Sequence, residues 1–236
     1  MTNFTTAADG VVLAYDDEGA GEPVVLIHGF AAGREITWKN TRWYESLLDA
    51  GLRVIAIDCR GHGESTKPHD VGSYDEGRMA SDIATVMDSC DVTVADVMGY
   101  SMGGYLAIRL MRDAPQRIRR VILGGVGETY FHFWEDRADM IADGLLAPDS
   151  TLIADATARE FRRFAEAAKN DLVALAACMR RSRVQFSCEQ LAALPHPTLV
   201  VCGENDAISG SPEGLARCFR DARTLIIPGQ IGRAHV

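Results

Sequence analysis

Short apolar segments alternate with longer helical patterns along most of this chain. Pro23–Ile27 and Arg53–Ile57 are almost continuously apolar, which is typical of strands buried on both faces. Tyr74–Cys90 carries apolar residues at helical spacing. This alternation predicts an α/β fold whose mostly parallel sheet has helices on both faces. Further strands are expected at Val11–Tyr15, Ala95–Tyr100, Arg120–Gly124, Pro197–Cys202 and Thr224–Ile227, and further helices at Trp43–Ala50, Met102–Ala114 and Leu215–Arg220.

The stretch 128–194 interrupts this alternation. Apolar residues recur there at helical spacing, and no segment is a convincing strand. We therefore expect a core built from 1–127 and 195–230, with 128–194 inserted as a helical cap. A chain of 236 residues can bury such a core without the help of a disulfide or a metal.

The charge of the chain limits its partners. A net charge of −9 argues against binding to nucleic acid or to an anionic membrane. The N-terminus has neither the basic nor the apolar region of a signal peptide, and no apolar stretch is long enough to cross a bilayer. We expect a cytoplasmic protein whose partners are a small molecule and water.

The cysteines are scattered and form no C-x-x-C pair. We expect them to be small buried residues in a reducing cytosol, free of disulfides. Because Cys and His do not cluster, neither a metal site nor a cofactor is expected. The cysteines are Cys59, Cys90, Cys178, Cys188, Cys202 and Cys218.

Gly99–Gly103 reads Gly-Tyr-Ser-Met-Gly and lies between an expected strand and an expected helix. The G-x-S-x-G pattern in that setting is typical of a nucleophile elbow, a strained turn that lifts the serine above the sheet. Flanking glycines relieve the crowding that a Cβ would cause there. Ser101 is therefore the candidate nucleophile.

Three further motifs accompany the elbow in the order seen in one family. They are His28–Phe30 (His-Gly-Phe), Asp58–Ser65 (Asp-Cys-Arg-Gly-His-Gly-Glu-Ser) and Gly203–Asp206 (Gly-Glu-Asn-Asp). With them the chain resembles the α/β-hydrolase family, in particular its small capped carboxylesterase-like and lactonase-like members, from about residue 8 to Gly229. The resemblance implies a mostly parallel sheet with a helical cap inserted after the sixth strand.

The resemblance also implies roles for individual residues. The backbone N–H groups of Phe30 and Met102 would form the oxyanion hole, and Asp206 would orient the catalytic histidine. Glu128 is the alternative acid, because some family members place it after the preceding strand. We interpret His28 and His62 as structural members of their loops. 

The catalytic histidine is the one expected residue that we do not find. The family places it after the last strand in a phrase resembling Pro-Gly-x-x-His, where this chain has Gly232. His235 is the alternative base, although residues 231–236, Ile-Gly-Arg-Ala-His-Val, match the translation of a common sequencing adapter. We therefore expect 231–236 to be a non-native tail, and a chain truncated there to be poorly soluble and nearly inactive.

The sequence favours a serine hydrolase that cleaves an ester-like bond through an acyl-enzyme. Serine at the elbow argues against the family branches that use aspartate, but it leaves carboxylesterases, lactonases, carbon–carbon bond hydrolases and perhydrolases open. A non-catalytic binding protein on the same fold is the alternative from another class. Apolar residues of the insert are candidates for cap packing or for an acyl pocket: Phe131, Phe133, Trp134, Phe161, Phe164 and Met179.

Overall fold

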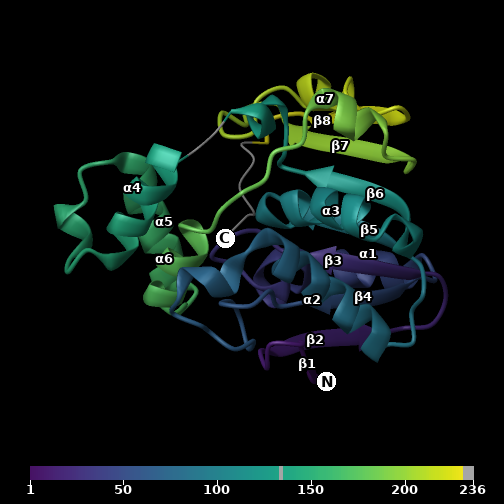
Figure 1. Cartoon of the computed structure of the whole chain (residues 1–236), viewed down its shortest axis with the longest axis horizontal. Coiled ribbons are helices and arrows are strands. Elements are labelled where there is room, and N and C mark those ends of the chain that lie inside the picture. The colour runs from purple at the N-terminus through teal and green to yellow at the C-terminus, as the bar shows by residue number, and fades with distance from the viewer. Residues whose placement is uncertain (133–134, 231–236) are drawn as a thin grey trace.

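A computed structural model describes residues 1–132 and 135–230 and contains one eight-stranded sheet. The strand order is β1-β2-β4-β3-β5-β6-β7-β8; β2 is antiparallel to both β1 and β4, and the remaining neighbours are parallel (Figure 1). This mostly parallel sheet confirms the predicted fold class. The strands are β1 (Asn3–Thr6), β2 (Val12–Glu18), β3 (Pro23–Ile27), β4 (Arg53–Ile57), β5 (Ala95–Tyr100), β6 (Ile118–Gly124), β7 (Thr198–Gly203) and β8 (Ala222–Ile227).

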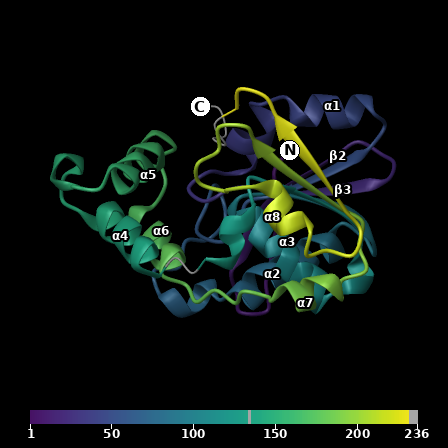
Figure 2. The ribbon, with the colours of Figure 1, turned by 90° about the horizontal axis from the view of Figure 1, so that it is seen from above.

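Helices lie on both faces of the sheet. Helix α1 lies on one side, whereas α2, α3 and α8 lie on the other, with α7 beside them (Figure 2). Helices α4, α5 and α6 stand away from the sheet. The helices are α1 (Trp43–Asp49), α2 (Glu76–Ser89), α3 (Met102–Asp113), α4 (Glu135–Leu146), α5 (Ala156–Ala167), α6 (Leu172–Met179), α7 (Cys188–Ala192) and α8 (Pro212–Ala216).

Strand β3 shows why its sequence is apolar throughout. Val25 and Ile27 point into the larger core beneath α2 and α3, whereas Val24 and Leu26 pack with Trp38 on the α1 side. Because successive side chains of a strand point to opposite faces, a strand covered on both sides needs apolar residues at every position.

The sheet is less well covered at its β8 edge. Leu225 and Ile227 pair with Val201 and Gly203 of β7, and they are 49% and 42% exposed. Val201 and Leu199 on the same face of β7 are only partly buried. This end of the sheet therefore presents an apolar surface to solvent.

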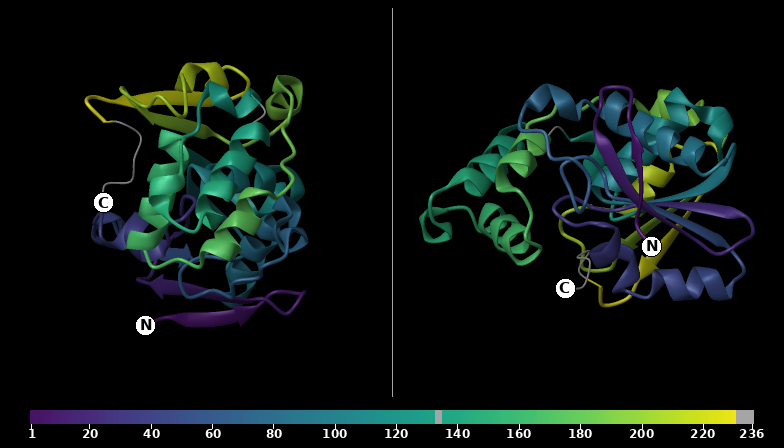
Figure 3. Two further views of the ribbon diagram at one scale, coloured as in Figure 1. Left: turned by 90° about the vertical axis from the view of Figure 1, so that its left-hand side faces the viewer. Right: turned by 90° about the horizontal axis from the view of Figure 1, so that it is seen from below.

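The segment between β6 and β7 is helical, as expected from its sequence. Its helices α4, α5 and α6 form one group above the carboxyl ends of the strands (Figure 3). The Arg162 guanidinium of α5 donates to the carbonyls of Gly144, Leu145 and Ala147, and so satisfies the free end of α4. The proposed boundaries 1–127, 128–194 and 195–230 remain predictions, and α7 lies with the core helices rather than with this group (Figure 2).

Two of the cysteines differ from the sequence expectation. Cys188 of α7 and Cys218 beyond α8 form a disulfide with Cα atoms 4.7 Å apart. Sequence spacing gave no signal for the pair, because folding brings them together across 30 residues. The other four, Cys59, Cys90, Cys178 and Cys202, are free and buried as predicted. The prediction of a cytoplasmic location consequently loses the support of the cysteine pattern.

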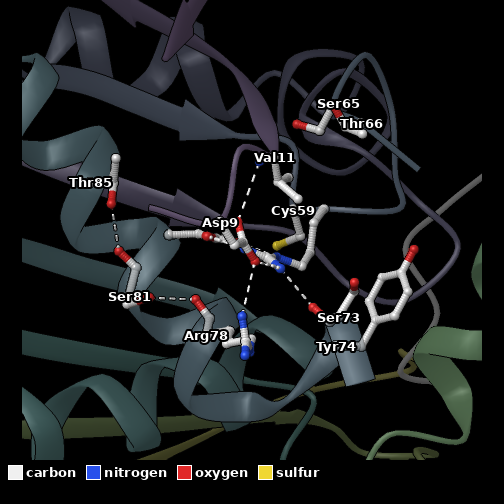
Figure 4. A network of polar contacts seen from close by, with 12 residues as sticks. Asp9, Val11, Cys59, Ser65, Thr66, Ser73, Tyr74, Arg78, Ser81 and Thr85 are labelled. Atoms are coloured by element: carbon white, nitrogen blue, oxygen red, sulfur yellow. Dashed lines mark hydrogen bonds and ion pairs between the residues drawn. The ribbon is translucent and has the colours of Figure 1, made fainter. Parts of the chain in front are cut away.

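Buried charges hold the loop that follows β4. Arg60 donates to both carboxylate oxygens of Asp82 at 2.7 Å and to Asp9 at 2.7 Å. Asp9 also accepts from the Val11 N–H and from Arg78, which anchors α2 to the β1–β2 turn (Figure 4). Among the described residues, no helix is both long and apolar enough to cross a membrane.

Candidate active site

Ser101 lies in a strained turn between β5 and α3. Its backbone adopts φ +48° and ψ −112°, a conformation that is costly for any residue with a Cβ. The turn is held in place because the Ser101 N–H donates to the Gly124 carbonyl at 2.7 Å. A Cβ on Gly99 would lie 2.2 Å from the carbonyl oxygen of Gly103, so this position accepts only glycine. The geometry is that of the predicted elbow.

The candidate oxyanion donors come from two different segments. Phe30 follows β3, and Met102 is the first residue of α3, where backbone N–H groups lack helical partners. Neither N–H forms a hydrogen bond within residues 1–132 and 135–230. Both residues line the same cavity as Ser101. Two unpaired N–H groups and a helix N-terminus thus favour negative charge beside the serine.

His28 and His62 are fully buried in the loops after β3 and β4. His28 Nε2 accepts the Cys59 N–H at 3.0 Å, so its proton is on Nδ1, 2.7 Å from the Gly29 carbonyl oxygen. Burial lowers the pKa of both rings, more strongly for His62. Neither residue lines the cavity. These contacts agree with the structural role expected of both residues.

Asp206 is almost buried in the loop after β7. Its Oδ1 accepts from the N–H groups of Ile208 and Ser209, both at 2.9 Å, and its Oδ2 accepts from the Ser209 hydroxyl at 2.6 Å. Ile208 and Ser209 both line the cavity that contains Ser101. The loop therefore holds a carboxylate in a fixed orientation next to the cavity.

The last described residues meet the loop that carries Asp206. The carbonyl oxygen of Gln230 accepts the Asn205 N–H at 2.8 Å, and the Gly229 N–H donates to Glu204 at 2.9 Å. The end of the described chain thus contacts the loop of the candidate acid. Gly232 and His235, on which the base prediction falls, lie outside the described residues.

Glu128, the alternative acid, lies in a neighbouring loop. Its N–H donates to the Ser211 carbonyl at 2.9 Å, while a Cβ on Gly214 would lie 2.4 Å from the Glu128 Cβ. The Glu128 residue is exposed and does not line the cavity, whereas Asp206 is buried and bonded to a lining residue. The geometry therefore favours Asp206 over Glu128 as the acid.

A cavity of about 490 Å³ connects the core with the helical segment. Phe161, Phe164 and Met179 of that segment line it, as their apolar character suggested. Phe131 packs instead against the core, with its ring centroid 5.3 Å from that of Tyr130. The predicted pocket residues Phe133 and Trp134 lie outside the described residues. The cavity is large enough for a small organic substrate.

The cavity also contains charged residues that the sequence gave no reason to single out. Glu76, Arg181 and Arg183 line it from α2 and from the segment after α6. Only the fold brings these positions together, so neither spacing nor a motif could have found them. In the part of the chain that the structure describes, no three metal-binding side chains gather closely enough to hold an ion.

The fold and this site define a class of proteins in which a glycine-flanked serine projects from a mostly parallel sheet into a capped cavity. Comparison with known sequences agrees: the family described as alpha/beta hydrolase fold matches residues 22–181. The chain belongs to the α/β-hydrolase fold family, which confirms the resemblance seen in its motifs.

Curated relatives carry several different activities in their names. The chain is 32% identical over 244 residues to 2-hydroxymuconate semialdehyde hydrolase from Pseudomonas sp. CF600, covering 95% of this chain and 85% of that protein. It is 36% identical over 144 residues to a putative 2-succinyl-6-hydroxy-2,4-cyclohexadiene-1-carboxylate synthase from Bacillus subtilis, covering 60% of this chain. That match spans only 51% of the B. subtilis protein, about half its length.

A solved structure resembles the chain over nearly its whole length. The thermophilic esterase from Thermogutta terrifontis, in a malate-bound form, is 30% identical with a TM-score of 0.76. The similarity covers 97% of this chain and 90% of the esterase. The shared fold therefore includes the helical segment as well as the sheet.

Proposed function

We propose that the protein is a serine hydrolase that cleaves an ester-like bond of a small molecule through an acyl-enzyme. One observation carries the proposal: Ser101 adopts the elbow conformation in a cavity where the Phe30 and Met102 N–H groups have no other partner among the described residues. A binding protein would not need a strained serine or two unpaired donors beside it.

The proposed reaction has two halves. Ser101 Oγ attacks the substrate carbonyl, its proton passes to a histidine base, and the N–H groups of Phe30 and Met102 stabilise the oxyanion. The base then protonates the leaving group, and a water activated by the same base releases the acid. Asp206 would hold the imidazole in the required tautomer. 

The base remains unassigned: the family places its histidine at position 232, where this chain has glycine, and His235 is the alternative. No histidine among the described residues lines the cavity. His28 and His62, in the loops after β3 and β4, are buried in structural contacts. Gln230, the last described residue, contacts the Asp206 loop, and the family places its histidine after the last strand. This proximity supports the chain order Ser, Asp, His.

A carbon–carbon bond hydrolase is the second candidate. The Pseudomonas relative is named a semialdehyde hydrolase, and the name of the T. terrifontis structure is that of an esterase. Both chemistries use a serine, an oxyanion hole and a histidine–aspartate pair, so the described residues support either. A perhydrolase or a non-catalytic binding protein would be distinguished by the same experiment.

A p-nitrophenyl ester series of increasing acyl length tests the proposal. In the Gly232→His chain, we expect hydrolysis that falls by at least about 10³-fold when Ser101→Ala is added and is unchanged by the exposed control Ser46→Ala. Gly232→His should raise the rate, whereas His235→Ala should lower it only if that residue is the base. Absence of hydrolysis in Gly232→His, together with turnover of a vinylogous 1,5-diketone, would replace the ester assignment with carbon–carbon cleavage.

A further inference from the structure

Arg181 forms one wall of the cavity with less hydrogen bonding than a buried guanidinium normally has. Its side chain is 3% exposed, and its Nη1 donates to the Cys178 carbonyl at 2.9 Å. Its Nε lies 3.9 Å from Glu76 Oε1, and neither atom has a hydrogen-bond partner among the described residues. Buried charged donors are usually satisfied, so this edge of Arg181 has capacity for another acceptor.

Arg183 lies beside it and has still weaker partners. Its Nη1 is 3.3 Å from the Arg181 carbonyl oxygen, and its Nη2 is 3.3 Å from the Met179 sulfur, a weak acceptor. It forms no ion pair with any carboxylate that the structure describes. Burial, and next the charge of Arg181, lower the Arg183 pKa to about 10. The residue is therefore still protonated at neutral pH, without a counter-ion of its own.

The charges of the cavity do not cancel. Three arginines line it, Arg137, Arg181 and Arg183, against two carboxylates, Glu76 and Glu160. The cavity thus carries a net positive charge in a chain whose overall net charge is −9. Apolar surroundings strengthen the field of such a group, so an anion entering the cavity would be attracted to it.

The nucleophile and the guanidinium groups line the same cavity. Tyr105 is one turn of α3 beyond Ser101, a rise of about 6 Å, and it also lines the cavity. The charge of Arg183 acts on Tyr105, where it opposes the rise in pKa that burial causes. Because Ser101, Arg181 and Arg183 line one cavity of about 490 Å³, a small molecule in that cavity can contact both the serine and the guanidinium groups.

We propose that the substrate of this hydrolase bears a carboxylate, which Arg181 and Arg183 bind while its scissile carbonyl lies over Ser101. The inference rests on the proposed function and names the class of its substrate: short-chain half-esters or oxo acids rather than neutral esters. A carboxylate supplies the acceptors that Arg181 Nε and Arg183 lack, and guanidinium groups bind carboxylates through charge-assisted hydrogen bonds. Glu76 opposes binding, because it is a fixed negative charge at the same end of the cavity.

Binding without turnover tests this inference. In calorimetric titration of Ser101→Ala, we expect monomethyl glutarate, which has one carboxylate, to bind at least about tenfold more tightly than neutral dimethyl glutarate. Arg183→Met should weaken binding of the monoester about ten- to a hundred-fold and leave the diester unchanged. Arg163→Met, which removes the same charge from an exposed site on α5, is the matched control.

Two further variants separate recognition from folding. Glu76→Gln should tighten monoester binding, whereas a purely structural role for Glu76 and Arg181 predicts only a lower melting temperature. Arg183→Lys, which keeps the charge, should bind the monoester more tightly than Arg183→Met. Equal affinity of the two esters for Ser101→Ala would overturn the inference. Monoester binding without hydrolysis by the Gly232→His chain, which keeps Ser101, would instead reject the proposed hydrolase function and leave the carboxylate site standing.

Discussion

Gly103 packs so tightly against the end of β3 that a Cβ on it would lie 2.1 Å from the carbonyl oxygen of Ile27. This approach brings the start of α3 next to the loop that carries Phe30. We expect Gly103→Ala to push the two apart, lower the free energy of unfolding by about 2–4 kcal/mol and abolish hydrolysis. Urea unfolding and ester turnover measure the two effects. 

Gly72→Ala is the matched control for that substitution. The nearest atom to its Cβ would be a side-chain oxygen of Asp70 at 3.3 Å, and its φ lies outside the left-handed region. We expect a change below about 0.5 kcal/mol and normal turnover. Equal effects of the two substitutions would show that the approach of Gly103 to Ile27 is not required.

His28 and His62 make stability depend on pH. Burial holds both pKa values below the usual histidine value of about 6.5. Because the unfolded chain takes up protons below pH 6.5 and the folded chain does not, stability is complete above this pH and falls below it. We expect the free energy of unfolding to fall as the pH is lowered from 7.5 to 5.5, by at most roughly 1.4 kcal/mol per pH unit for each histidine. His62→Asn should remove the larger part of that fall in urea titrations, because the pKa of His62 is lowered more strongly.

The disulfide between Cys188 and Cys218 fixes α7 to the end of α8. It closes a loop of 30 residues, for which chain entropy gives a stabilisation of roughly 3–4 kcal/mol. We expect dithiothreitol to lower the free energy of unfolding by up to that amount in the wild type. Cys188→Ser should show the loss without reductant, whereas Cys90→Ser, at a free buried cysteine, should retain the sensitivity to dithiothreitol.

The exposed apolar face of β8 should promote self-association. Leu225 and Ile227 stand at a sheet edge that also leaves backbone groups free, and exposed apolar edge strands are sites of aggregation. We expect Leu225→Lys with Ile227→Lys to reduce binding of an apolar dye and the concentration dependence of light scattering. The exposed pair Leu152→Lys and Val173→Lys, away from this face, should change neither.

Local sequence motifs were enough to predict most of the fold and half of the residues of the candidate site. Apolar runs identified every parallel strand. The central strands are apolar because they are covered on both faces, whereas β8 keeps an apolar run although most of it is exposed. Strand β1 was missed, since its four residues alternate between partial and full exposure. Helix α8 begins at Pro212 rather than Leu215, because Ser211 caps it by accepting the Gly214 N–H.

Long-range contacts account for what the sequence did not predict. Ser101 and its oxyanion partners belong to short contiguous motifs. A few neighbouring residues are therefore enough to predict their positions. Glu76 and Arg181 meet only when the segment after α6 folds back over α2, and Cys188 meets Cys218 in the same way. No short pattern encodes such encounters, because each depends on the path of the whole chain.

The contact between the loops after β6 and β7 has an evolutionary consequence. Thr129 Oγ1 donates to the carbonyls of Ile208 and Ser209, at 3.0 and 2.8 Å, so the segment beginning at Glu128 and the loop of Asp206 form one continuous surface. A change in the length or sequence of either loop is therefore transmitted to the other through this hydroxyl. The two loops are thus constrained to vary together.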